Sequence, residues 1–575
     1  MQSDVEALRR AGKRLALDAE QFVAGAAMGE PAMRRLMAGS SFILTLDEVR
    51  SSLAEAGKVP DADPIHKDHA ADEHAAGLRS RGEAEEKKER EIGRASSLPV
   101  PAETGPPWAS SSRPQSAAQT PSGARSPASS APAGPASAPQ SAHLSEPERK
   151  SIEVTVARPP SYRPLAKEYA PRIQIQNHTD VSGQSRCVGS VEDFVAYFRD
   201  RFEREGAILK THQTNLPVLR TGQLSQHSGE EVRIIAMVTE KRMTHNGNLY
   251  IELEDEEGAA KAIFSPRERG FAQKAGAIIR DDVVALDVRV GPNFLSVKDV
   301  TWPDIPLLRP QKTAEADLAV AYLSDTHIGS KLFLEKSFRR FIRWLWGEEG
   351  REELAGRVKY VIIAGDICDG IGVYPAQEKE LSIKDIYEQY AAFDKLMEAM
   401  PDWVEVIISP GNHDAVRRGE PQPIIPMEMV KSDVKKIGSP AMVDLEGFRH
   451  LVYHGTSLDS VIANVPGLSY VRPEGAMMEV LRRRHLSPVY GENPIVPERR
   501  DYMVIEEEPD VVHMGHLHKN AAMKYRGTLL LNSGTFQERT DFQVRMGHVP
   551  TPGIVPILEL KDQRLSQLKF TEETI

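Results

Sequence analysis

Cysteine is scarce in this chain: Cys187 and Cys368 are the only two among 575 residues. Two thiols cannot build a disulfide framework, nor can they supply a zinc cluster made of cysteines. Any metal ion in the protein must therefore be bound by histidine, aspartate or asparagine side chains.

Long apolar runs are absent as well. No stretch approaches the roughly 20 apolar residues that cross a bilayer. The first residues, MQSDVEALRRAGKRLALDAE, carry charges where a secretory signal peptide needs an unbroken apolar core. The composition, with 27% charged and 40% hydrophobic residues, is typical of a soluble protein. We therefore expect a cytoplasmic protein with no membrane partner.

An excess of positive charge is also missing, because the formal net charge is -11 at pH 7. This balance gives no support to nucleic-acid binding. An acidic protein can still bind nucleic acid when a basic groove, a metal site or a partner chain neutralises the phosphates. Net charge therefore excludes neither possibility.

The first 160 residues divide into two parts. Residues 1–75 are predicted to form a small helical N-terminal domain, either a partner-docking domain or an appendage without a separate role. Residues 76–160 contain a run of charges (EAEEKKERE) and then a tract rich in Ser, Pro, Ala and Gly. Such a segment buries too little apolar surface to offset its ordering entropy, so we expect a disordered linker.

Residues 161–310 are predicted to form an OB-type β-barrel with a flanking helix. Ser190 and Asp193 can cap a helix that carries Phe194, Phe198 and Phe202 on one face. Five short strand-like segments follow, at 232–238, 249–253, 260–264, 283–290 and 294–297. Barrels of this type often bind nucleic acid, and the open alternative is a barrel that only packs against its neighbour.

Residues 311–575 alternate apolar strands with helical stretches, as in an α/β domain. The predicted strands at 318–323, 360–364, 404–408, 451–453 and 510–514 are each followed closely by polar residues. In chain order these are Asp325 and His327; Asp366 and Asp369; Asn412, His413 and Asp414; His454; and His516 and His518. Open α/β sheets bind ligands beyond the carboxyl ends of their strands, so the five strand ends can converge on one crevice.

The residue types at these strand ends indicate a metal centre. Carboxylate, amide and imidazole groups suit Mn, Fe or Zn, and the carboxylate of Asp366 can bridge two cations about 3.5–4 Å apart. Gly365, Gly411, Gly455 and Gly515 let the backbone turn sharply beside these ligands. Each motif alone has an ordinary explanation as a surface pair or a turn. Their occurrence together, in this order, predicts a two-metal phosphoesterase.

The ordered set Asp-x-His, Gly-Asp-x-x-Asp, Gly-Asn-His-Asp, His and Gly-His-x-His resembles the calcineurin-like metallophosphoesterase superfamily over about residues 317–540. The resemblance implies a four-layer α/β/β/α sandwich with a dinuclear centre. It implies a first metal held by Asp325, His327, Asp366 and His518. It implies a second metal held by Asp366, Asn412, His454 and His516.

The resemblance also implies roles for residues that do not bind metal. His413 would help the leaving oxygen, as a proton donor or a charge stabiliser. Asp414 would orient His413, or alternatively only cap a turn, and Asp369 would support the ligands from behind. Two divalent ions activate water at neutral pH and neutralise charge on the phosphate. Mn is the expected metal, with Fe, Zn and Mg as alternatives.

A wider resemblance covers most of the chain. A helical module, a low-complexity tether, an OB-like domain and this phosphoesterase domain occur together in the small subunits of the archaeal family D DNA polymerases. The strings LSDTHIGS at 323–330, GIGVYP at 370–375 and SPGNHDAVRR at 409–418 are similar to that family.

This wider resemblance implies a 3′→5′ exonuclease used for proofreading. Its substrate would be DNA with single-stranded or mismatched 3′ ends, and its partner a large catalytic polymerase subunit. The alternatives are a stand-alone metallophosphatase or phosphodiesterase, and a non-catalytic scaffold subunit, which would lack metal ligands.

Several remaining residues fit no motif. His485, His513 and His548 are interpreted as ordinary polar or partly buried residues. Arg417 and Arg418 are candidates for contacts with phosphates. The run Arg482–Arg484 is predicted to be solvated surface.

Overall fold

The structure, a computed structural model, describes residues 14–15, 43–44, 162–310 and 312–571. Strands β1 (Arg14–Leu15) and β2 (Ile43–Leu44) pair in parallel. The predicted helical domain at 1–75 and the predicted linker at 76–160 otherwise lie outside the described residues. No helix within the described ranges is long and apolar enough to cross a membrane.

A long helix precedes the barrel. Helix α6 (Val191–Lys210) begins at Ser190, whose side chain accepts from the backbone of Asp193 while the Asp193 carboxylate accepts from Ser190, so the predicted capping box is confirmed. Phe198 is buried on its inner face, and Phe194 and Phe202 are partly buried beside it. The apolar stripe predicted for this helix therefore packs against the barrel.

Five strands form a closed barrel. They are β5 (Glu231–Met243), β6 (Leu249–Asp255), β7 (Gly258–Phe264), β8 (Val283–Val290) and β9 (Leu295–Thr301). Their order is β5-β6-β7-β9-β8, and β8 closes the barrel by pairing with β5. The short strand β4 (Val218–Leu219) adds to β5, and helix α7 (Phe271–Lys274) precedes β8. The five predicted strand segments correspond to these five strands.

Two six-stranded sheets follow. The first has the order β13-β12-β11-β10-β19-β20, and its strands are Lys435–Lys436, Glu405–Ser409, Val358–Ala364, Ala319–Leu323, Ile554–Glu559 and Arg564–Lys569. The second has the order β17-β18-β16-β15-β14-β3, and its strands are Ala521–Tyr525, Thr528–Asn532, Val511–Met514, Phe448–Val452, Ala441–Leu445 and Ile173–Ile175. Strands β10, β11 and β12 run parallel, as do β15 and β16.

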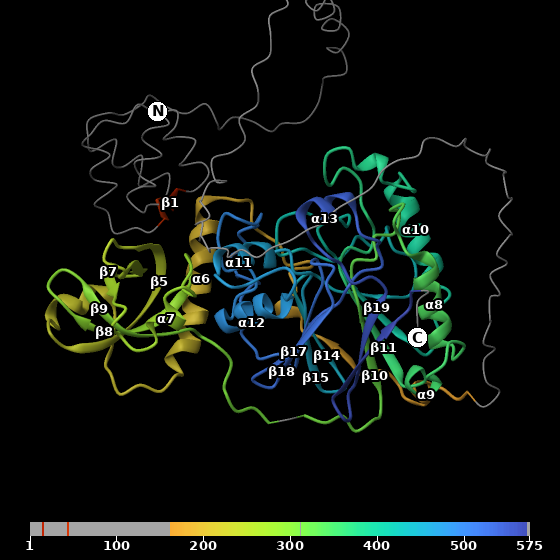
Figure 1. Ribbon diagram of the computed structural model, residues 1–575, viewed down its shortest axis with the longest axis horizontal. Helices are drawn as coiled ribbons and strands as arrows, with labels where there is room; N and C mark the ends of the chain where they lie inside the picture. Colours follow the sequence, from red (N-terminus) through yellow and green to blue (C-terminus); the bar gives the residue numbers. More distant parts are fainter. Residues whose placement is uncertain (1–13, 16–42, 45–161, 311, 572–575) are drawn as a thin grey trace, which may run out of the picture. The chain divides into compact units, whose positions relative to one another are not determined.

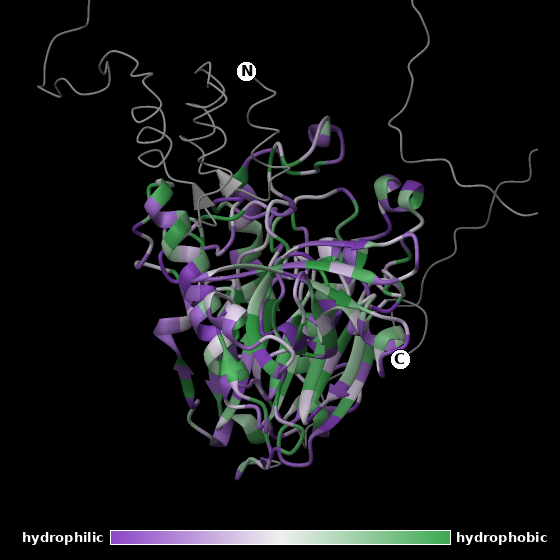
Figure 2. Ribbon diagram, turned by 90° about the vertical axis from the view of Figure 1, so that its left-hand side faces the viewer, coloured by the Kyte–Doolittle hydropathy of each residue, from purple (hydrophilic) through white to green (hydrophobic). Residues whose placement is uncertain are grey.

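Helices cover the outer face of each sheet. Helices α8 (Glu335–Leu345) and α10 (Ile386–Met397) pack on the first sheet, and α11 (Leu458–Asn464) and α12 (Pro473–Arg483) on the second (Figure 1). Buried side chains from both sheets fill the space between them, and the strands there are largely hydrophobic (Figure 2). The short helices α9 (Glu352–Ala355) and α13 (Asp541–Met546) complete the domain. The result is the predicted order of helix, sheet, sheet and helix.

The segment before the barrel contributes to the phosphoesterase-like part of the chain. Strand β3 pairs with β14 across a span of more than 260 residues. The Tyr162 hydroxyl donates to the Leu345 carbonyl at 2.8 Å, and Ala166 in the 3-10 helix η1 (Leu165–Glu168) packs beside Leu318. The predicted division at residue 310 therefore does not separate the two sets of strands cleanly.

Buried arginines join the barrel to helix α12. Arg483 donates to the Asp282 carboxylate at 2.8 Å and also pairs with Glu479. Arg484 donates to the Ile505 carbonyl and pairs with Glu508. Both arginine side chains are almost fully buried. The prediction that Arg482–Arg484 is solvated surface was wrong for these two residues, because buried acidic groups and carbonyls satisfy their guanidinium groups.

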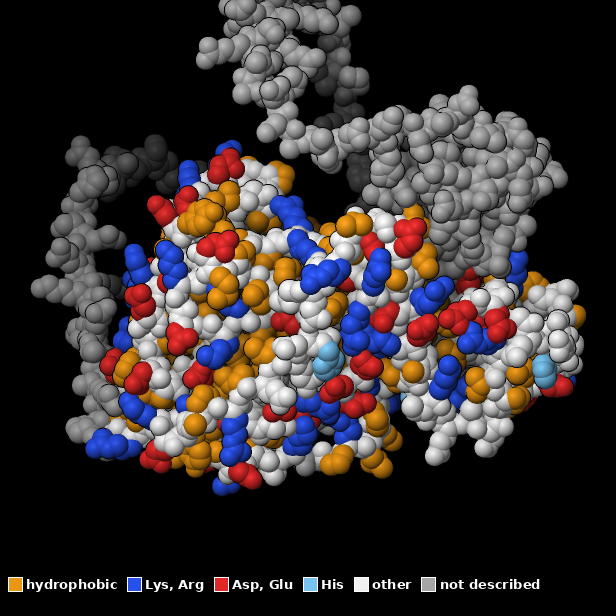
Figure 3. All heavy atoms as spheres, turned by 180° about the vertical axis from the view of Figure 1, so that it is seen from behind, with side chains coloured by type: hydrophobic (Ala, Val, Ile, Leu, Met, Phe, Trp, Pro, Cys, Tyr) orange, Lys and Arg blue, Asp and Glu red, His pale blue; other side chains and the backbone are white. Residues whose placement is uncertain are grey.

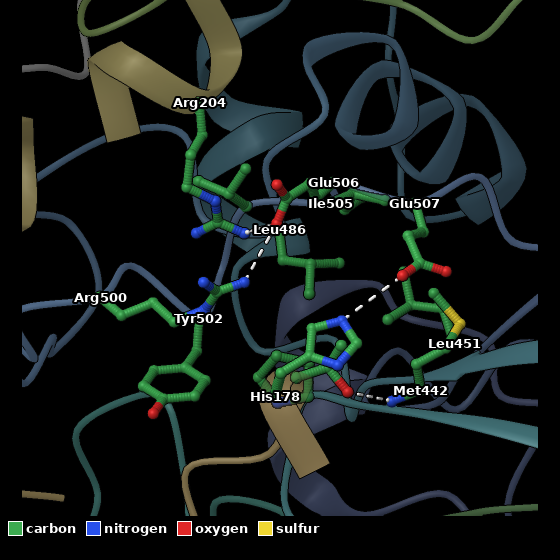
Figure 4. Close-up of a pocket in the computed structure, with 13 residues that line it drawn as sticks. His178, Arg204, Met442, Leu451, Leu486, Arg500, Tyr502, Ile505, Glu506 and Glu507 are labelled. Atoms are coloured by element: carbon green, nitrogen blue, oxygen red, sulfur yellow. Dashed lines mark hydrogen bonds and ion pairs between the residues drawn. The ribbon is translucent and has the colours of Figure 1, made fainter. Parts of the chain in front are cut away.

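Lys and Arg side chains gather over the middle of one face, with Asp and Glu side chains among them (Figure 3). A small pocket lies where α6 meets the second sheet (Figure 4). At its edge Arg204 and Arg500 each pair with Glu506 at 3.0 Å, and His178 lies 3.5 Å from Glu507. None of the predicted metal ligands lines this pocket.

Candidate metal centre

The five predicted strand ends meet in one place. Strands β10, β11 and β12 deliver their polar residues from the first sheet, and β15 and β16 deliver theirs from the second. Three overlapping groups of side chains bring their ligand atoms within 4.8 Å of one another: Asp325, His327 and His518; His327, Asp366 and His413; and Asp325, Asp366 and His454. Sequence spacing therefore identified residues that the two sheets bring together.

Three imidazoles are held so that Nε2 faces the cluster. His327 Nδ1 lies 3.0 Å from the Asp369 carboxylate, and His454 Nδ1 lies 2.9 Å from the Ala364 carbonyl. The Gln543 side-chain amide lies 2.8 Å from Nδ1 of His518. Metal-binding histidines commonly use one ring nitrogen for such an anchoring contact and the other for the ion.

Asp366 occupies the middle of the cluster. Its Oδ2 lies 3.2 Å from Nε2 of His454 and 3.7 Å from Nε2 of His327, while Oδ1 accepts from the His413 backbone at 2.9 Å. Asp325 receives the His516 backbone N–H at 3.0 Å and lies 3.4 Å from Nε2 of His518. A carboxylate between two groups of imidazoles has the position that a bridging ligand needs.

The backbone is bent sharply at these residues. Five of them adopt left-handed conformations with φ between 47° and 65°: Asp325, His327, Asp366, His516 and His518. Such a conformation costs on the order of 1–3 kcal/mol for a residue other than glycine. A side chain on Gly411 would collide with the backbone and carboxylate of Asp366, and one on Gly515 with Asp325 and Ser324. Only glycine fits at these two positions, because the backbone lies too close to neighbouring atoms to leave room for a side chain.

The charges of the cluster favour a cation. Burial alone would lower the pKa of these imidazoles, and it does lower the pKa of His518 and His413, but at His327 and His454 the carboxylates outweigh that effect. Asp369 and Asp366 raise the pKa of His327 to about 9, and Asp366 and Asp325 raise that of His454 to about 10. Burial would raise the pKa of Asp366, yet the neighbouring imidazoles hold it well below its usual value.

The donor set fits divalent metal ions. In neutral His454, Nδ1 donates to the Ala364 carbonyl, so the Nε2 lone pair faces Oδ1 of Asn412 at 3.0 Å. Lone pairs that converge in this way repel one another unless a proton or a cation lies between them. Nitrogen and oxygen donors of this kind suit Mn, Fe or Zn, and no thiolate takes part because Cys368 is not among the clustered ligand atoms.

His413 stands at the open side of the cluster, with 16% of its side chain exposed. Its Nδ1 lies 2.7 Å from the Asp369 carbonyl, and its Nε2 lies 4.0 Å from Oδ2 of Asp366. The neighbouring Asp414 accepts hydrogen bonds from three backbone N–H groups and from the Tyr390 hydroxyl. These contacts favour the turn-capping alternative for Asp414 over an orienting role on the His413 ring.

Sequence reasoning missed a carboxylate beside His516. Asp459, in the first turn of α11, places Oδ2 3.0 Å from Nε2 of His516, so Nδ1 of that ring is the nitrogen left for the cluster. The carboxylate of Asp369, which was predicted to support the ligands, lies 3.0 Å from Nδ1 of His327. No local motif marks Asp459, because the contact joins residues 57 positions apart.

Comparison with known proteins identifies the family. A family model described as calcineurin-like phosphoesterase matches residues 318–520. A protein of Archaeoglobus fulgidus described as DNA polymerase II small subunit is 39% identical over 410 residues, covering 70% of this chain and 82% of that protein. The chain belongs to the family of DNA polymerase II small subunits.

A second relative agrees with this assignment. The DNA polymerase II small subunit of Methanocaldococcus jannaschii is 41% identical over 409 residues, covering 69% of this chain and 68% of that protein. A solved archaeal phosphodiesterase, 15% identical, covers 44% of this chain and 99% of its own with a TM-score of 0.22, which is too low to add an argument. The family resemblance predicted from the motifs is confirmed, and this small-subunit homologue carries a calcineurin-like phosphoesterase domain.

Proposed function

We propose that this chain is the small subunit of a heterodimeric archaeal replicative DNA polymerase, and that its phosphoesterase domain is a metal-dependent 3′→5′ DNA exonuclease. The observation that carries the proposal is the convergence of six imidazole and carboxylate side chains, with the Asn412 amide against His454. A subunit that serves only as a scaffold needs no such set.

Seven side chains hold the two ions in this proposal. Asp325, His327, Asp366 and His518 bind the first ion, and Asp366, Asn412, His454 and His516 bind the second. Asp366 is therefore the bridge, consistent with its central position among the imidazoles. Mn is the proposed metal, with Fe, Zn and Mg as alternatives.

The chain's own residues prepare the site for phosphodiester hydrolysis. Bound divalent ions supply water activation at neutral pH and neutralise the charge of the phosphate. Asp369, Asp459 and the Ala364 carbonyl hold three imidazoles in the tautomer and orientation that ligation needs. His413 presents Nε2 at the open side and assists the leaving oxygen, by donating a proton or by stabilising its charge.

The proposed substrate is DNA with single-stranded or mismatched 3′ ends. Two observations support it: the relatives are named as subunits of a DNA polymerase, and a five-stranded barrel precedes the phosphoesterase domain. We assign that barrel to the OB type, which commonly binds nucleic acid. The name small subunit implies a large catalytic polymerase subunit as the partner.

A manganese-dependent nuclease assay tests the proposal. Wild-type protein and His413→Ala would be compared on 3′-labelled single-stranded and mismatched primer DNA, each with and without the large subunit. We expect labelled nucleotides to be released by the wild type and release to fall sharply in His413→Ala. Full activity of His413→Ala would refute its role. A wild type that hydrolyses small phosphate esters and leaves DNA intact would instead indicate a stand-alone metallophosphatase or phosphodiesterase.

A further inference from the structure

Two segments meet beside the Gly-His-x-His end of the metal centre. The loop 465–472 follows helix α11, and residues 544–550 comprise the end of helix α13 and the turn after it. The rings of Tyr470 and His548 join these segments, because they stack with centroids 4.4 Å apart and planes 28° from parallel. Both helices lie in the upper half of the domain in Figure 1.

Apolar side chains next to this ring pair are unusually exposed. Val471 is 66% exposed, and Met546 and Val549 are each 58% exposed. We call Tyr470, Val471, Met546, His548 and Val549 the rim patch. These side chains flank the ring pair in the sequence, and exposed apolar surface on a soluble protein can mark a binding site.

Contacts connect the rim patch directly to two of the proposed metal ligands. Tyr470 interacts with the Asp459 carboxylate, which in turn contacts Nε2 of His516 at 3.0 Å. Just before the other segment, Gln543 of α13 contacts His518. A polymer that presents a phosphodiester to the metal centre therefore passes next to this patch.

The charge of the two segments differs from that of the whole chain. Residues 465–472 and 544–550 contain Arg472 and Arg545, both exposed, and His548, but no aspartate or glutamate. The complete chain carries a net charge of -11. Apolar and aromatic groups together with basic side chains are what single-stranded nucleic acid requires, because bases stack on rings while phosphates need positive charge.

We propose that the rim patch binds the unpaired bases of a single-stranded DNA end whose phosphodiester enters the metal centre. Bases stack on the Tyr470–His548 pair and pack against the exposed aliphatic side chains, and Arg472 and Arg545 supply charge for the phosphates. The inference rests on the proposed nuclease function. A protein subunit is the less favoured occupant, because one seated here would cover the entrance that a DNA strand needs.

The direct test is binding of a fluorescein-labelled oligothymidylate to the full chain, measured by fluorescence anisotropy in EDTA so that no cleavage occurs. Tyr470→Ala removes both the ring and its hydroxyl, whereas Tyr470→Phe keeps the ring and loses only the contact with Asp459. Met427→Ala is the matched control, because Met427 is an exposed apolar side chain outside the patch. We expect about a tenfold higher Kd for Tyr470→Ala, the size of one lost base-stacking contact. Tyr470→Phe and Met427→Ala should bind like the wild type.

Several results would overturn this inference. Wild-type affinity in Tyr470→Ala would do so, as would equal losses in Tyr470→Phe and Tyr470→Ala, since the ring would then be irrelevant. Unchanged DNA affinity together with weaker binding of the large subunit would reassign the patch to that partner.

Cleavage kinetics separate this inference from the proposed function. If the wild type releases nucleotides from DNA, and Tyr470→Ala does so with an unchanged KM, only the rim patch is refuted. If the wild type hydrolyses bis(p-nitrophenyl) phosphate but not DNA, the nuclease function itself fails. We expect Tyr470→Ala to raise KM for DNA by more than it lowers kcat.

Discussion

The contact between Asp459 and His516 leads to a graded prediction about metal affinity. The Asp459 carboxylate lies 3.0 Å from Nε2 of His516, which leaves Nδ1 for the proposed second metal position. Loss of such a supporting partner typically weakens metal binding about 10- to 100-fold. Because 49% of the Asp459 side chain is exposed, water can partly replace it. We therefore expect the low end of that range, about tenfold or roughly 1.4 kcal/mol, for Asp459→Ala.

Two further variants sharpen this prediction. Asp459→Asn keeps an oxygen that can accept from Nε2 and should lose less affinity than Asp459→Ala. Asp369→Ala removes the equivalent support of His327, where the carboxylate is almost fully buried and water cannot substitute. Its effect should approach the upper end of the range, about 100-fold.

Isothermal titration of the metal-free full chain with manganese measures these effects. The loss in Asp459→Ala should fall on one of two binding events, since His516 belongs to one metal position. Wild-type affinities in Asp459→Ala would refute the reasoning, and so would an equal loss at both positions.

Three other perturbations follow from the packing. Gly411→Ala pushes a methyl group against Asp366 and should abolish tight metal binding, whereas Gly206→Ala, whose methyl group would lie 3.7 Å from Ile235, should bind metal normally in the same titration. Burial raises the pKa of Glu205 to about 8 from 4.5, so the folded protein keeps a proton that the unfolded chain loses, and stability falls as the pH rises from 4.5 to 8. Above pH 8 the free energy of unfolding of Glu205→Gln should therefore exceed that of the wild type by about a few kcal/mol, and below pH 4.5 the two should differ little. Urea unfolding at several pH values measures this difference, and a gain in stability that does not depend on pH would contradict the prediction. Arg483→Ala leaves Asp282 and Glu479 buried without their partner and should destabilise the protein by about 3–5 kcal/mol in the same assay, whereas a loss under 1 kcal/mol would argue against the buried pair.

Short sequence patterns predicted those helices and strands that depend mainly on residues close together in the sequence. The strand predicted at 318–323 is Ala319–Leu323 in the structure, and the one at 283–290 has the same bounds. The cap at Ser190 followed from a spacing of three residues. The metal cluster was predictable for a related reason: its side chains lie just beyond strand ends, and parallel strands carry such ends to one edge.

Contacts between distant segments were not predictable. Nothing near Asp459 indicates that α11 lies against the loop of His516, and nothing near Ile173 indicates that it pairs with β14. Arg483 and Arg484 looked like surface residues because charged side chains usually are. The burial of Arg483 depends on Asp282, 201 positions earlier, and that of Arg484 on Ile505 and Glu508, which no local pattern connects to them. The roles of Asp414 were left open for the same reason, until its backbone partners were known.

Anomalous diffraction from manganese-soaked crystals of the wild-type chain tests the central claim most directly. The account predicts two peaks about 3.5–4 Å apart, one on each side of the Asp366 carboxylate. The first should lie among His327, His518 and Asp325, and the second among Asn412, His454 and His516. A single peak, or peaks away from Asp366, would contradict the two-metal centre.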